Sequence, residues 1–242
     1  RSYSETGSMY RTVGIEILVH AAFDEEIVTM NEKLINDEYI DYNIPKNDES
    51  SNSKTYALII ANERYPRPLP DVPYAYNDGE KMQQYCVRTL GIPSRQVKII
   101  EDATMQDIKK EGVAWLKDIA SSQKGDCQFL IYYAGHGLTD YDRNPYIVPK
   151  DINYKGIKSM RKKKSIDTET RMSSRDTKRL LEQCLRIDTL CSWFNRVPVK
   201  SITMIVDASF DGNQRDGEPL VNMKLSNQRI AQNTMSDYTV RE

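Results

Sequence analysis

The chain lacks several features that would assign it to a class of protein at once. No apolar run approaches the roughly 20 residues that a membrane-spanning helix needs. Lysine plus arginine (34) and aspartate plus glutamate (35) nearly balance, so no basic field attracts nucleic acid. The first residues also lack the charged-then-apolar pattern of a signal peptide. These absences predict a protein without membrane or nucleic-acid partners.

Cysteine is scarce as well, and its placement matters more than its number. Cys86, Cys127, Cys184 and Cys191 lie in apolar helix or strand patterns, without the paired spacing of a metal site. We therefore expect buried free thiols in a reducing compartment, which predicts a cytoplasmic location, and we assign no metal ligands.

The chain does contain a regular alternation of apolar runs and amphipathic stretches. Strands are predicted at 56–61, 97–100, 127–134 and 202–206, and helices at 77–90, from 104 onward and at 188–194. This order predicts an α/β fold of three layers, with a mostly parallel central sheet between helices. No glycine-rich phosphate loop follows the first of these strands, so a nucleotide-binding domain is a poor interpretation.

The N-terminal part follows another pattern. Apolar residues alternate from Val13 to Phe23, which predicts a half-buried strand in a small appendage outside the main sheet. The polar run that follows is expected to be a linker. We therefore predict an appendage at 1–45, a linker at 46–54 and a main domain at 55–242.

Two of the predicted strands end on polar residues that carry chemistry. One is followed by Gly135-His136-Gly137 and the other by Asp207-Ala208-Ser209. Ligands of open α/β sheets bind at the carboxyl ends of the strands, so these segments are expected to meet at one edge. The glycines beside His136 allow close approach of a substrate to the backbone.

Four segments, taken in order, resemble the signatures of the caspase-like cysteine peptidases, and most closely those of metacaspases and bacterial orthocaspases. They are Tyr56–Asn62, Asn77-Asp78, Tyr133–Gly137 and Asp207–Gly212. The similarity runs from Lys54 to the C-terminus. It implies a caspase-like fold and hydrolysis of peptide bonds in protein substrates by a cysteine–histidine pair.

The resemblance also implies a role for each matching residue. His136 matches the histidine that assists the nucleophile and protonates the leaving amine, and Ser209 stands where the catalytic cysteine is expected. Backbone N–H groups of Gly137 and Ser209 would form the oxyanion hole. Asp78 and Asp207 would line the pocket for the residue before the cut bond.

The charge of that pocket predicts its specificity. Two carboxylates in a partly desolvated pocket favour an Arg or Lys side chain, and Arg most of all for its planar fork. True caspases instead cut after Asp and use arginines, and Arg64 or Arg67 would then be the candidates. We predict basic specificity and keep acidic specificity as the alternative.

Ser209 departs from the family pattern. A serine hydroxyl is a far weaker acid than a thiol and needs a well-oriented general base. We therefore expect this chain to be inactive or severely impaired as a peptidase. Three interpretations stay open: a serine introduced to prevent self-cleavage, a natural pseudo-peptidase that acts as a binding or scaffolding module, and a working serine peptidase.

A strongly basic segment follows the histidine motif. It contains Arg161, Lys162, Lys163, Lys164, Arg171 and Arg175. Such a run is either a solvated loop or, beside an Arg/Lys-specific site, a segment for self-processing.

Two expectations come from the resemblance alone. Relatives have further strands beyond the position of Gly212, so we expect a cleaved, truncated or omitted C-terminal part, or a separate small-subunit chain, to complete the sheet. Many relatives are activated by calcium, but the spacing of Asp140, Asp142 and Asp151 assigns no metal site here.

Overall fold

The structure, a computed structural model, describes most of the main domain and little of the two ends. The described residues are 14–20, 44–48, 51–67, 69–154, 174–208, 210 and 238–239, and in 14–20, 174 and 238–239 only the backbone is described. Ser209 and the predicted basic residues from Arg161 to Arg171 therefore lie outside the described residues.

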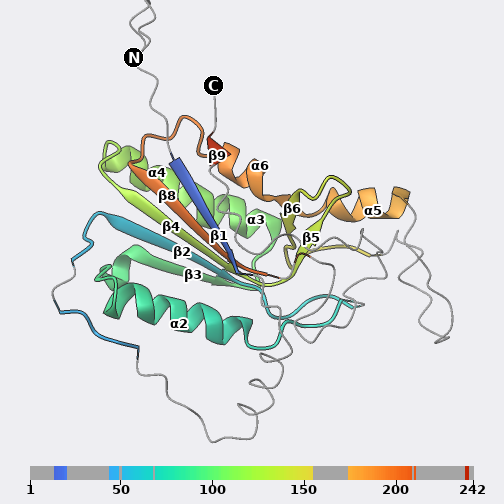
Figure 1. Cartoon of the computed structure of the whole chain (residues 1–242), viewed down its shortest axis with the longest axis horizontal. Helices are drawn as coiled ribbons and strands as arrows, with labels where there is room; N and C mark the ends of the chain where they lie inside the picture. The colour runs from blue at the N-terminus through green and yellow to red at the C-terminus, as the bar shows by residue number, and fades with distance from the viewer. Residues whose placement is uncertain are drawn as a thin grey trace, which may run out of the picture.

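A six-stranded sheet forms the centre of the fold (Figure 1). Its order is β3 (Val97–Glu101), β2 (Thr55–Ala61), β4 (Gln128–Ala134), β8 (Ser201–Asp207), β1 (Gly14–His20) and β9 (Tyr238–Thr239). The first five strands in this order are parallel, and β9 runs antiparallel to β1. The predicted strands at 56–61, 97–100, 127–134 and 202–206 are all confirmed.

Helices cover both faces of the sheet, as the sequence predicts (Figure 1). One face packs on α2 (Ala75–Arg88). The other packs on α3 (Met105–Asp107), which continues through a π-helical turn (Ile108–Val113) into α4 (Ala114–Ser122), and on α6 (Ile187–Ser192). In β2, β3, β4 and β8, alternate residues enter two hydrophobic clusters, one on each face of the sheet, because successive side chains point to opposite faces.

Local sequence signals set the start of α3. Thr104 accepts a hydrogen bond from the backbone N–H of Asp107 at 3.1 Å, and the Asp107 carboxylate accepts one from the N–H of Thr104 at 2.9 Å. This reciprocal capping box confirms the prediction made from the spacing of the two residues.

A second, three-stranded sheet lies between β4 and α6, where the sequence pattern predicts no strand. It contains β5 (Gly137–Thr139), β6 (Pro145–Ile147) and β7 (Leu185–Arg186), and α5 (Ser174–Leu181) precedes β7. The carboxylate of Asp140 closes the β5–β6 hairpin by accepting hydrogen bonds from the N–H groups of Asp142 and Asn144, each at 2.9 Å. Strands of two or three residues are too short to give a periodic signal.

The N-terminal strand is present, but its predicted location is wrong. β1 pairs in parallel with β8, from Ile15 opposite Ile202 to His20 opposite Asp207. It is therefore a strand of the central sheet and not an appendage outside it. The alternation of apolar and polar residues indicates that a strand is half buried, but it does not indicate which other strand it pairs with. β1 forms hydrogen bonds with the edge of β8, whose backbone N–H and C=O groups would otherwise be unpaired.

The four cysteines are buried and free, as predicted. Burial raises the pKa of the Cys86 and Cys191 thiols to about 11, and it also raises the pKa of Cys127 and Cys184. Within the described ranges, no helix combines the length and the apolar character needed to cross a membrane.

Candidate active site

The two strands that carry the predicted catalytic segments are direct neighbours. β4 and β8 pair in parallel, with Ala134 opposite Asp207, and the N–H of Gly135 donates to the Asp207 carbonyl at 3.3 Å. His136 and Ser209 each follow that register pair by two residues. The structure therefore brings the strand ends that lead to both positions to one edge of the sheet.

The chain on either side of position 209 is anchored beside the histidine segment. Ala208 and Phe210 are both buried, and the Thr139 hydroxyl donates to the Phe210 carbonyl at 3.2 Å. Since Thr139 ends β5 and His136 directly precedes it, the segment after β8 runs next to the strand that begins with Gly137.

The side chain of His136 is buried, with the residue 5% exposed, and one ring nitrogen has a defined partner. Its Nε2 lies 2.8 Å from the carbonyl oxygen of Pro70. A carbonyl oxygen only accepts hydrogen bonds, so Nε2 carries a proton, and in the neutral form of the ring Nδ1 is then the acceptor nitrogen. This is the tautomer that a general base acting through Nδ1 requires.

The loop after β2, residues 62–74, places the Pro70 carbonyl. Its first residue, Asn62, is fully buried and bridges three chain segments. The Asn62 amide donates to the carbonyls of Ala103 at 3.2 Å and Val148 at 3.3 Å, and its oxygen accepts from the Ala103 N–H at 2.7 Å. The root of the loop is thus tied to the ends of β3 and β6.

Asp102 holds the next two residues of this loop. Its Oδ1 accepts from the backbone N–H groups of Glu63 at 3.2 Å and Arg64 at 2.9 Å, and its Oδ2 binds the ammonium of Lys150. Burial alone would raise the pKa of Asp102, but the hydrogen bonds, Lys150 foremost, lower it below its usual value. Asp102 has a φ of 49°, a left-handed conformation unusual for a residue other than glycine.

The N–H of Gly137 is turned away from β6. The Val148 N–H donates to the His136 carbonyl at 3.1 Å, so His136 and Val148 form a hydrogen-bonded position of the antiparallel ladder. Gly137 and Ile147 are the next pair in register. Since hydrogen-bonded and non-hydrogen-bonded pairs alternate, the Gly137 N–H does not donate to β6. Because β5 is the edge strand of this sheet among the described residues, the Gly137 N–H faces the side opposite β6.

The two predicted pocket carboxylates lie at the same edge and on the same side. Asp207 ends β8 and shares its face with Ile205, which packs in the cluster on the α2 side. The Tyr132 hydroxyl donates to Oδ2 of Asp207 at 3.3 Å. Asp78 lies in the first turn of α2, which begins at the edge where β2 ends (Figure 1).

The two arginines named for the alternative, acidic specificity lie in the loop after β2. Arg64 and Arg67 are exposed, and the guanidinium of Arg64 lies 6.0 Å from the centre of the Tyr76 ring. Of the predicted basic segment, Arg175 is described; it is exposed on α5.

Sequence reasoning missed the backbone acceptor and the two tyrosines that surround His136. The Tyr65 ring packs against the imidazole, with ring centres 4.6 Å apart, and Tyr133 donates to the His136 carbonyl at 2.8 Å. A carbonyl group is common to every residue, so no sequence signal distinguishes Pro70. Tyr133 belongs to the histidine motif, but the contacts of its hydroxyl depend on the tertiary fold.

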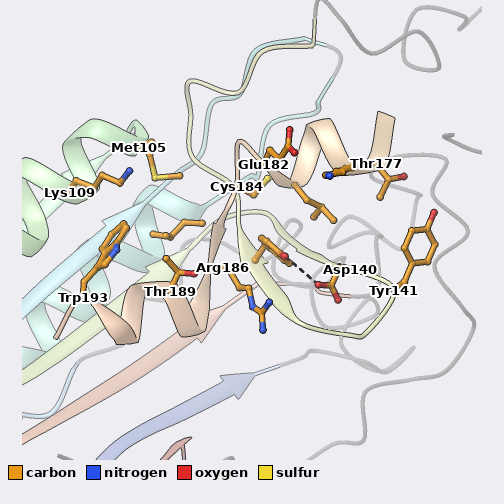
Figure 2. Close-up of a pocket in the computed structure, with 14 residues that line it drawn as sticks. Met105, Lys109, Asp140, Tyr141, Thr177, Glu182, Cys184, Arg186, Thr189 and Trp193 are labelled. Atoms are coloured by element: carbon orange, nitrogen blue, oxygen red, sulfur yellow. Dashed lines mark hydrogen bonds between the residues drawn. The ribbon is translucent and has the colours of Figure 1, made fainter. Parts of the chain in front are cut away.

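A cavity of about 670 Å³ lies elsewhere, between the β5–β6 hairpin, α5 and α6 (Figure 2). Its lining includes Lys109, Asp140, Cys184, Arg186 and Trp193, and none of the predicted catalytic or pocket residues. Several of its polar groups are already used in the fold: Asp140 accepts from Tyr146 at 3.3 Å, and Arg186 binds Asp188 at 2.7 Å. It is distinct from the edge that carries His136.

The described residues contain no group of three or more His, Cys, Asp or Glu side chains positioned to share a metal ion. Both oxygens of Asp140 serve the hairpin, and Asp151 accepts from the N–H of Met105 at 2.9 Å.

Comparison with known proteins identifies the family. The model of the caspase domain matches residues 54–240. The chain belongs to the caspase domain family. This family consists of cysteine peptidases, and the fold is the caspase-like α/β arrangement that the sequence predicts. Placement in the metacaspase or orthocaspase branch stays a prediction.

One solved structure similar to this caspase-domain chain is the crystal structure of caspase-1 from Spodoptera frugiperda. The two sequences are 14% identical, and the superposition has a TM-score of 0.41. The match covers 71% of this chain and 54% of the Spodoptera chain, so this chain spans about half of that protein's length. A search of curated protein sequences found no match.

Proposed function

We propose that this chain is the catalytic domain of a cysteine-type endopeptidase that cleaves after Arg or Lys, and that Ser209 leaves it inactive or severely impaired. The observation that supports this most is the imidazole of His136. It is bound through Nε2 to the Pro70 carbonyl, at the edge where β8 ends with Asp207, two residues before position 209. The other proposed roles depend on this arrangement.

With a thiol at position 209, the reaction follows from this tautomer. Nδ1 of His136 takes the thiol proton, and the thiolate attacks the carbonyl carbon of the scissile bond. The imidazolium then returns its proton to the leaving amine, and a water molecule hydrolyses the acyl-enzyme. Throughout, the Pro70 carbonyl accepts a hydrogen bond from Nε2–H and stabilises the charged ring.

The same acceptor explains why serine is a poor substitute. Serine peptidases place a carboxylate behind the histidine, which stabilises the imidazolium more strongly than a neutral carbonyl does. A thiol has a pKa near 8.5 and needs less help to ionise. Pro70 therefore suits a thiol nucleophile and supports a serine hydroxyl weakly.

The oxyanion of the tetrahedral intermediate is proposed to bind the N–H groups of Gly137 and residue 209. The direction of the Gly137 N–H, away from β6, supports this role, because the donor is fixed by the β5–β6 ladder before substrate arrives. Such a donor needs no reorganisation during the reaction.

Basic specificity is proposed to come from Asp78 and Asp207. Both lie at the carboxyl edge on the α2 side, and Tyr132 orients the Asp207 carboxylate. A substrate Arg would gain charge-assisted hydrogen bonds there. Protein substrates, self-processing in the segment from Arg161 to Arg175, and a separate small-subunit chain belong to the same proposal.

A binding or scaffolding module is the second candidate, and Ser209 itself favours it. A caspase-type cleft with a weak nucleophile retains its shape and charge and would hold a basic peptide without cutting it. If the chain is a peptidase domain, the serine at position 209 is the only obstacle to turnover. If it is a binding module, a cysteine at this position does not restore turnover.

The test is a peptide-library digest by the chain and by Ser209→Cys. The proposal predicts cleavage after Arg and Lys by the Ser209→Cys variant, and its loss in the double variant with His136→Ala. Cleavage after Asp would contradict the specificity. A folded Ser209→Cys variant that binds basic peptides without cleaving them would favour the binding module.

A further inference from the structure

The ladder between the histidine segment and β6 contains a side chain where a backbone hydrogen bond is expected. The β5–β6 register places His136 opposite Val148, and the Val148 N–H donates directly to the His136 carbonyl at 3.1 Å. The reciprocal bond is interrupted. The His136 N–H donates to the Tyr65 hydroxyl at 3.2 Å, and that hydroxyl lies 3.2 Å from the Val148 carbonyl.

The hydroxyl of Tyr133 binds the same pair of residues, His136 and Val148. The Tyr133 hydroxyl accepts from the Val148 N–H at 3.3 Å and donates to the His136 carbonyl at 2.8 Å. The hydroxyls of Tyr65 and Tyr133 are 3.3 Å apart. Each hydroxyl has one proton, and an arrangement with Tyr65 donating to Val148 and Tyr133 donating to His136 uses each proton once. The buried pair is therefore fully satisfied.

Gly135 leaves the space for these two hydroxyls. A Cβ atom at this position would lie 2.6 Å from the Tyr133 oxygen and 2.7 Å from the Tyr65 oxygen. Both distances are shorter than carbon–oxygen contact allows. The glycine before His136 is thus required by the phenol pair, in addition to any approach of substrate.

Tyr65 also connects the imidazole to the loop that carries its acceptor. Its ring packs on the imidazole at 4.6 Å between centres, and its own N–H donates to Oδ1 of Asp71 at 3.0 Å. Pro70 precedes Asp71 in the same loop. One side chain therefore holds the backbone of His136, contacts its ring and belongs to the loop that binds Nε2.

We propose that Tyr65 is a positioning residue that aligns the His136 imidazole with the Pro70 carbonyl through its hydroxyl. The inference rests on the proposed function, because alignment of this ring matters for turnover only if His136 is the acid/base. Tyr65 is not required to touch substrate. Burial raises the pKa of Tyr65 and of Tyr133 above the usual value, so both hydroxyls keep their protons at neutral pH.

The first test measures the imidazole without any need for activity. The chain has only two histidines, so ¹⁵N-edited NMR resolves both, and His20→Gln assigns them. The unaltered chain is expected to show the Nε2-protonated tautomer for His136. Tyr65→Phe, which keeps the ring, is expected to shift this signal and to raise the exchange rate of the imidazole proton by about tenfold or more. Tyr85→Phe, an exposed tyrosine on α2, is the matched control and should change neither.

The second test measures turnover in the Ser209→Cys background. Tyr65→Phe is expected to lower kcat by about 10- to 100-fold with little change in KM, because the ring is misplaced while the cleft is intact. Tyr133→Phe removes a hydroxyl of similar burial but keeps the Tyr65 bond to the His136 N–H. It is therefore expected to have a smaller effect.

The outcomes separate the two claims. If Tyr65→Phe leaves the imidazole signals and kcat as Tyr85→Phe does, the positioning role is wrong. If Tyr65→Phe does not fold, equal effects of Tyr133→Phe and Tyr85→Phe on the His136 signals would overturn the phenol network. If the signals respond as expected but Ser209→Cys never cleaves peptides, the positioning of His136 stands and the peptidase function fails.

Discussion

Nε2 of His136 lies 2.8 Å from the carbonyl oxygen of Pro70, a residue 66 positions earlier in the chain. This contact sets the tautomer of the ring and identifies the group behind it as a neutral backbone acceptor. Such an arrangement favours a thiol over a hydroxyl as nucleophile. The contact therefore explains why we expect a serine at position 209 to be a poor nucleophile at this edge of the sheet.

Gly135→Ala tests the close packing beneath the histidine. A methyl group here would meet the hydroxyls of Tyr65 and Tyr133 at less than 3 Å, so unfolding free energy should fall by about 1–3 kcal/mol. Urea denaturation measures this change. In the Tyr133→Phe background, where the nearer hydroxyl is gone, the same substitution should cost less. Equal costs in both backgrounds would show that the contact with the Tyr133 hydroxyl is not the cause.

Asp102→Asn tests the anchor of the Pro70 loop. The pKa of Asp102 is lowered in the folded state, so its contribution is complete above its unfolded pKa of about 3.9 and is lost as pH falls through the folded value. We expect the variant to be less stable by about 1–3 kcal/mol at pH 7. The difference should shrink below about pH 4.

The control for Asp102 is Asp126→Asn. Asp126 also binds lysines, Lys54 and Lys200, but at an exposed site. Surface pairs of this kind contribute little, so the stability of this variant should hardly change at pH 7. An Asp102 variant that behaves like the Asp126 variant at every pH would contradict the anchoring role.

Leu18→Pro tests the position of β1. Leu18 pairs with Ile205 of β8, in a strand that has β9 on its other side. Proline removes a backbone donor, so we expect a loss of about 3 kcal/mol or more and faster hydrogen exchange in residues 202–206. Unchanged stability and exchange would contradict the pairing of β1 with β8 and would favour the separate appendage that the sequence predicts.

Asp207→Asn tests the specificity pocket. In the Ser209→Cys background, loss of one charged hydrogen-bond partner should lower kcat/KM for Arg substrates by about 10- to 100-fold. A neutral residue before the cut bond should be affected less. Asp118→Asn, on the exposed side of α4, is the control. The pocket assignment fails if both variants retain full selectivity for Arg.

Much of this fold follows from local patterns. The buried strands at β2, β4 and β8 and the capping box of Thr104 and Asp107 could be predicted because apolar periodicity and capping act within a few residues. The same patterns placed His136 and Asp207 at neighbouring strand ends. The partner of β1 could not be predicted, because alternation does not record which edge a strand pairs with.

The second sheet and the surroundings of His136 were beyond sequence reasoning for a different reason. β5, β6 and β7 have three, three and two residues, too few for a period to appear. The Pro70 carbonyl and the Tyr65 hydroxyl act through contacts between segments about 70 residues apart, which tertiary packing determines. The roles assigned to Ser209, Gly137 and Asp78 stay predictions that the experiments address.

The most direct measurement is covalent labelling of the Ser209→Cys variant by a peptidyl-arginine chloromethyl ketone, mapped by mass spectrometry. The four native thiols are buried and have raised pKa values, so they should stay unlabelled and the unaltered chain should not react. The account predicts labelling at position 209 that is faster than with the peptidyl-aspartate analogue and is lost with His136→Ala. Labelling that favours aspartate, or that persists at the same rate without His136, would contradict it.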